Sequence, residues 1–104
     1  MWKLINLFLA SSAHMDAICY WTAHNRADAL GAISKAVRLE TNEKLLPKHL
    51  VYMAEIEVVL GMNEEANINF HKASELISKY SDFWSSHENL VVANKVKRYL
   101  RSNA

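Results

Sequence analysis

Glycine and proline are scarce in this chain, and their scarcity argues against a sheet architecture. Two glycines and one proline occur among the 104 residues. A β-sandwich or β-barrel needs many tight turns, which these two residues commonly form. Hydrophobic residues still make up 51% of the chain, which is ordinary for a folded domain and argues against disorder. The composition therefore predicts one all-α domain over residues 1–104.

Cysteine and net charge are also nearly absent. Cys19 is the single cysteine, so no disulfide can form within the chain. This fits a reducing compartment, and we expect a cytoplasmic protein with Cys19 buried as a small apolar side chain. The formal net charge is only +1. No strong overall field therefore attracts the chain to nucleic acid or to a membrane surface.

Long apolar runs are missing as well. Residues 4–10 are apolar except for Asn6, and they lie between Lys3 and a run of small residues. This arrangement superficially resembles a signal peptide, but the run is short and Asn6 interrupts it. We expect the segment to belong to the folded domain. The run also falls short of the roughly 20 apolar residues that a membrane span requires, so we expect no membrane partner.

A pattern of five residues occurs twice in the chain. Its first copy is Ala17, Ala29, Ile33, Ala36 and Leu39, and its second, 37 positions later, is Ala54, Ala66, Phe70, Ala73 and Leu76. Small residues at fixed intervals let two helices approach closely. The pattern predicts two helical hairpins, at about residues 2–40 and 46–80, with a capping helix at about 85–101. The alternative is a bundle of five unrelated helices, with alanine recurring because it favours helices.

In these residues the chain resembles the tetratricopeptide repeat family. The copy at about residues 47–80 places Leu50 and Ala54 at first-helix positions of that repeat, and Ala66, Phe70 and Ala73 at second-helix positions. The chain departs from the family in its spacing of 37 rather than about 34 residues, and in lacking the closing proline. The resemblance implies stacked hairpins that bind other proteins in a concave groove.

The family register also implies which residues face that groove. The expected partner-binding residues are His14, Ile18, Trp21, Val51, Glu55 and Val58. A groove lined partly by apolar side chains suits a peptide or a partner helix with hydrophobic anchors. His14 and Ile18 do not match the basic and amide side chains of the family's carboxylate-clamp members. We therefore do not expect recognition of a C-terminal carboxylate.

Motifs for catalysis and cofactor binding are missing from the sequence. The glycines Gly31 and Gly61 form no phosphate-binding loop, and the five histidines show no close metal-ligand spacing. We expect no enzyme activity, no cofactor and no metal site, and we interpret the chain as a non-catalytic scaffold or adaptor.

Two other functions stay open from the sequence. The apolar residues Trp2, Ile5 and Phe8 could be covered by a second copy, giving a homodimer or a homo-oligomeric adaptor, chaperone-like or regulatory protein. The basic C-terminal segment could instead contact nucleic-acid phosphates through Lys95, Lys97, Arg98 and Arg101. A solvated helix end, stabilised by the helix dipole, is the simpler interpretation of that segment.

Overall fold

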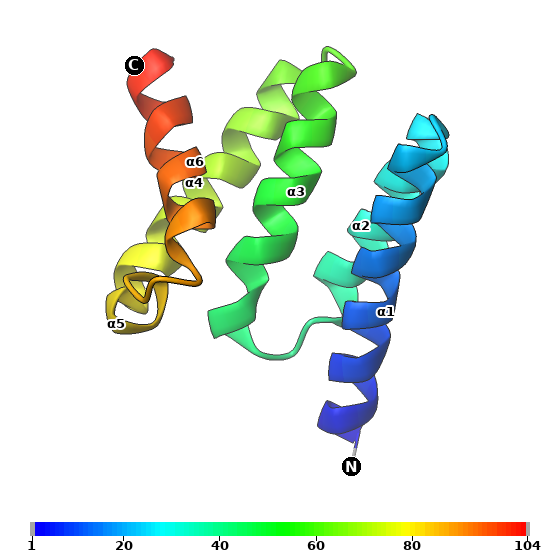
Figure 1. Ribbon diagram of the computed structural model, residues 1–104, viewed down its shortest axis with the longest axis horizontal. Coiled ribbons are helices and arrows are strands. Elements are labelled where there is room, and N and C mark those ends of the chain that lie inside the picture. Colours follow the sequence, from blue (N-terminus) through cyan, green and yellow to red (C-terminus); the bar gives the residue numbers. More distant parts are fainter. Residues whose placement is uncertain (1, 104) are drawn as a thin grey trace.

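The computed structural model describes residues 2–103 and folds this range into helices joined by short turns (Figure 1). The elements in chain order are α1 (Trp2–Thr22), α2 (Arg26–Leu39), the 3-10 turn η1 (Glu43–Leu45), α3 (Leu46–Val59), α4 (Asn63–Lys79), α5 (Ser81–Trp84) and α6 (Leu90–Ser102). No strand occurs within the described range, which confirms the predicted all-α class. The side chain of Trp2 lies outside the described part, so the structure does not place it.

The helices pack largely in the order in which they follow one another. α1 packs along α2, α3 packs along α4, and α2 lies against α3. α6 returns over the second pair and contacts both α4 and α3. Figure 1 shows α3 in the middle of the molecule, with α1 and α2 on one side and α4 and α6 on the other. α3 therefore has neighbouring helices on both flanks and lies at the centre of the molecule.

The turns inside the two helix pairs have the same backbone geometry. His24 ends the first turn with φ 64°, and Gly61, 37 positions later, ends the second with φ 79°. The residue that follows each donates its N–H to the carbonyl five residues earlier, at 2.8 Å in both turns. This left-handed closure satisfies carbonyls at the end of the preceding helix. Both turns therefore reverse the chain so that the next helix packs back on the previous one.

The repeated alanines lie where the paired helices touch. All six, Ala17, Ala29, Ala36, Ala54, Ala66 and Ala73, are fully buried. The first copy belongs to a core cluster between α1, α2 and Ile56 of α3. The second belongs to a cluster that α3 and α4 share with Val96 of α6. α3 contributes to both clusters, so it joins the two helix pairs into one core.

The C-terminal region differs from its prediction. The last helix begins at Leu90 rather than near residue 85, and the short helix α5 precedes it. The Ser85 and Ser86 hydroxyls donate to the carbonyls of Asp82 and Phe83 at the end of α5, and so they do not cap α6. The buried Trp84 indole N–H donates to the carbonyl of Lys44, 3.1 Å away, and so fixes α5 against η1.

The prediction that Cys19 is buried is wrong, because its side chain is exposed. Cys19 follows the buried Ala17 by two residues, and an offset of two turns a side chain to the opposite side of a helix. Cys19 therefore lies on the face of α1 that points away from the core.

Candidate functional site

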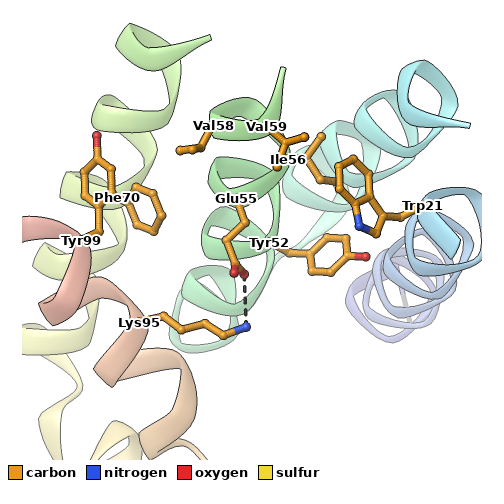
Figure 2. Close-up of a pocket in the computed structure, with 9 residues that line it drawn as sticks. All are labelled: Trp21, Tyr52, Glu55, Ile56, Val58, Val59, Phe70, Lys95 and Tyr99. Atoms are coloured by element: carbon orange, nitrogen blue, oxygen red, sulfur yellow. Dashed lines mark hydrogen bonds and ion pairs between the residues drawn. The ribbon is translucent and has the colours of Figure 1, made fainter. Parts of the chain in front are cut away.

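A groove of about 510 Å³ runs over α3 and forms the candidate functional site (Figure 2). Its lining residues come from four helices and are Trp21, Tyr52, Glu55, Ile56, Val58, Val59, Phe70, Lys95 and Tyr99. The volume lies in the range that holds a small ligand or a few anchoring side chains of a larger one. Seven of these nine side chains are aliphatic or aromatic, so burial of apolar surface is the main interaction the groove offers.

One wall of the groove is aromatic and is formed by the end of α1. Trp21 lies in the last turn of α1, and its indole is only partly buried. The Arg26 guanidinium lies 5.6 Å from the centre of the Trp21 ring, a distance that allows a cation–π contact. Figure 2 shows Tyr52 pointing from α3 toward Trp21. Burial and the nearby Glu55 charge raise the pKa of the Tyr52 phenol above its ordinary value, so the phenol keeps its proton and can donate a hydrogen bond.

The opposite wall is formed by α4 and α6. The rings of Phe70 and Tyr99 are stacked, with their centres 3.9 Å apart. Lys95 Nζ lies 3.2 Å from the Glu55 carboxylate, which links α6 to α3 across the groove. Both side chains are about two-fifths exposed, and such a pair adds at most about 1 kcal/mol of stability. The pair is therefore accessible to a bound segment, and both of its charges can be reached.

The structure places the six predicted partner-binding residues in different environments. Three of them line the groove, namely Trp21, Glu55 and Val58. The other three do not line it, namely His14, Ile18 and Val51. The groove-facing position predicted for His14 and Val51 is wrong because both side chains are buried. Val51 packs in the core between α3 and α4, His14 turns toward α3, and Ile18 is half-buried.

Six further groove residues were not predicted from the sequence, namely Tyr52, Ile56, Val59, Phe70, Lys95 and Tyr99. Tyr52 and Val59 lie three and four residues from Glu55, so they share its face of α3, and this spacing is a signal present in the sequence. Lys95 and Tyr99 are four apart on one face of α6. No local pattern places α6 beside α3, because that contact depends on how the chain returns after α5.

Behind the groove, two histidines and a glutamate form a buried hydrogen-bonded chain. The Nδ1 atoms of His14 and His49 are 2.8 Å apart, and His49 Nε2 lies 2.7 Å from the Glu40 carboxylate. His49 Nε2–H donates to the Glu40 carboxylate, so Nδ1 of neutral His49 accepts from His14 Nδ1–H. The centre of the His14 ring is 5.0 Å from that of Tyr52, which connects this cluster to the groove.

Burial keeps the histidines of this cluster neutral. It lowers the pKa of His14 from 6.5 to about 4, and the charges of His49 and Lys48 add to the effect. Burial also lowers the pKa of His49, although the hydrogen bond to Glu40 opposes that change. The cluster therefore joins α1 to α3 through neutral rings at physiological pH.

A second buried polar contact joins α3 to α4. The Asn69 amide donates to the Glu57 carboxylate at 2.6 Å, and both side chains are buried. Burial raises the Glu57 pKa, with Glu65 adding to the effect and the bond from Asn69 opposing it. Across residues 5–103, every buried side-chain nitrogen or oxygen atom has a hydrogen-bond partner. The buried polar groups are therefore satisfied internally.

The described residues give little indication of metal or membrane chemistry. In this part of the chain, His, Cys, Asp and Glu side chains form no group of three that could hold a metal ion. None of the described helices has the length and apolar character needed to cross a membrane. Lys95, one of the four basic residues considered for nucleic acid, pairs with Glu55.

Comparisons with protein-family models, with curated proteins and with solved structures gave no match.

Proposed function

We propose that this chain is a non-catalytic protein-interaction domain built from two tetratricopeptide-like hairpins and a capping helix. The groove over α3 binds a peptide or a partner helix through two or three apolar anchor side chains. The observation that carries the proposal is the groove itself, which gathers mainly apolar side chains from four helices. Aromatic side chains at its edge, Trp21 above all, are the kind that dominate binding energy at protein interfaces.

Matched positions support the repeat interpretation. α1 and α3 end at Thr22 and Val59, and α2 and α4 begin at Arg26 and Asn63, both pairs being 37 residues apart. The alanines and the left-handed turn residues follow the same spacing. In stacked hairpin repeats the first helix of each unit lines the concave face. α1 and α3, which hold Trp21, Glu55 and Val58, occupy those first-helix positions.

The chemistry of the groove defines the segment that it would accept. Apolar anchors would enter between Trp21, Tyr52 and Val59, where the lining is aromatic and aliphatic. The exposed Glu55–Lys95 pair offers one acceptor and one donor to polar groups of the bound segment. Because both signs of charge are present, a strongly acidic or strongly basic segment gains little there. The preferred ligand is an amphipathic segment with modest net charge.

Selection from a random peptide library, followed by titration of the selected peptides, tests this proposal. We expect Trp21→Ala to weaken binding about tenfold or more, since truncating an aromatic side chain that becomes buried in the complex costs at least about 1.4 kcal/mol. Tyr20→Ala is the matched control, because Tyr20 is the neighbouring aromatic residue on α1 and is exposed outside the groove. If the selected peptides bind the folded Trp21→Ala and Tyr20→Ala variants with equal affinity, the groove is not the binding site.

A further inference from the structure

α1 presents an exposed face that the groove does not use. The residues of this outer face are Ile5, Phe8, Ser12, Met15, Cys19 and Thr22, and all six are exposed. Phe8 is 72% exposed and Met15 is 58% exposed, so this face holds two large apolar side chains in contact with solvent. The face lies opposite the buried stripe of Ala10, Ala13 and Ala17 that packs toward the core. α1 therefore has a second apolar face with no covering element in the described structure.

The outer face of α1 also differs from the other helices in charge. None of its six residues is an aspartate, glutamate, lysine or arginine, and Lys3 and Asp16 are the only residues of these types among the 21 of α1. The exposed faces of α2 and α4, by contrast, hold charged residues such as Arg26, Lys35 and Glu75. A solvated helix face ordinarily bears charged residues. An uncharged apolar face of this length is typical of a surface that another protein covers.

The spacing on the outer face is that of a two-helix seam. The six residues follow one another at intervals of three, four, three, four and three. This alternation of three and four, which repeats every seven residues, keeps one line of side chains facing a partner helix along its length. The spacing points to a long helix lying alongside α1, rather than to a short or irregular segment.

The order of side chains along the seam makes it complementary to itself in the antiparallel direction. Reversing the order places Ile5 opposite Thr22, Phe8 opposite Cys19 and Met15 opposite Ser12. Each large side chain then meets a smaller one. In a parallel pair each residue would meet its own copy, so two Phe8 rings would crowd while two Ser12 side chains left a gap.

We propose that this protein forms an antiparallel homodimer through the outer faces of two α1 helices. A 21-residue helix is about 30 Å long, so the contact falls at the small end of specific interfaces, under about 1,200 Å². We therefore expect a dimer that dissociates in the micromolar range. Trp21 and the groove are not part of the seam, so the dimer does not depend on the proposed peptide binding.

Sedimentation equilibrium over a range of concentrations tests the dimer. We expect dimers of the wild type, and a dissociation constant raised about 30-fold or more in Phe8→Asp, because a charge would be buried at the seam. Ile68→Asp is the matched control, since Ile68 is 54% exposed on α4, and it should dimerise like the wild type. Met15→Asp should repeat the Phe8→Asp result. Far-UV circular dichroism verifies that each variant is folded.

Four results would overturn the proposal. The first is a wild type that stays monomeric up to about 1 mM, well above the micromolar range. The second is a dimer that persists in Phe8→Asp, and the third is an Ile68→Asp variant that loses the dimer as fully as Phe8→Asp does. The fourth is a monomeric wild type that binds lipid vesicles through α1 and sediments with them. The orientation has its own test under mild oxidation. Phe8→Cys should form disulfides between position 8 and Cys19 of the second copy, while disulfides joining two copies of Cys19 in the wild-type dimer would contradict the antiparallel arrangement.

Discussion

His14 and His49 meet Nδ1 to Nδ1 at 2.8 Å, and this contact joins α1 to α3 inside the protein. His49 continues the chain to the Glu40 carboxylate, which follows the end of α2. One buried cluster therefore links the first helix pair to the start of the second. Its two neutral imidazoles make the junction sensitive to acid, while the surrounding alanine packing is insensitive to pH.

The first prediction is that stability falls on acidification between pH 6.5 and about pH 4. The pKa of His14 is lowered in the folded state, so the unfolded chain binds more protons in this window and acid favours unfolding. A shift from 6.5 to about 4 corresponds to roughly 3 kcal/mol of unfolding free energy lost by the lower end. The raised pKa of Glu57 acts in the opposite direction, as the pH falls through that raised pKa down to the ordinary pKa of a glutamate.

Urea unfolding at several pH values checks this prediction. His14→Asn keeps an amide near the position of Nδ1 but cannot take up a proton, so it should reduce the dependence of stability on pH. His71→Asn changes an exposed histidine on α4 and should leave that dependence unchanged. The same pH dependence in all three proteins would show that the buried cluster does not control acid sensitivity.

The second prediction concerns the alanines at the helix crossings. Ala66→Leu should lower the unfolding free energy by about 1–3 kcal/mol, because Ala66 is fully buried and the added carbons must displace α3 or α4. Ala27→Leu adds the same atoms on the exposed side of α2 and should change stability little. Thermal melting compares the two, and an equally stable Ala66→Leu variant would contradict the close crossing.

The third prediction is that one substitution has opposite effects at the two glycines. Gly31 lies inside α2, where a Cβ would meet no atom within 4 Å, so Gly31→Ala should stabilise the protein by about 1 kcal/mol. Gly61 has φ 79°, which strains any residue with a Cβ, so Gly61→Ala should destabilise it by about 1 kcal/mol. Chemical denaturation measures both, and changes of the same sign would rule out this explanation.

Local patterns in the sequence were enough to predict the helical class and the crossing residues. The alanine offsets identified side chains that are all fully buried, because close helix contact requires small residues at those places. The left-handed turn at Gly61 also follows from residue type. At the other turn His24, not a glycine, adopts positive φ, which shows that the turn geometry can override residue preference.

Positions that depend on distant contacts were harder to predict. A family register placed His14 and Val51 on the groove, but His14 pairs with His49, 35 residues away, and Val51 packs toward α4. The start of α6 was misplaced because Ser85 and Ser86 bond backward to α5. Exposure of Cys19 could have been deduced from its offset of two from Ala17.

The central claim is that the groove over α3 binds a protein segment through apolar contacts. Isothermal titration of a library-selected peptide against Val58→Asp and Val91→Asp tests it most directly. Val58 is 42% exposed in the groove, whereas Val91 is 62% exposed on α6 outside it. We predict that Val58→Asp raises the dissociation constant about tenfold or more and that Val91→Asp leaves it unchanged. Equal affinity of the two folded variants would contradict the claim.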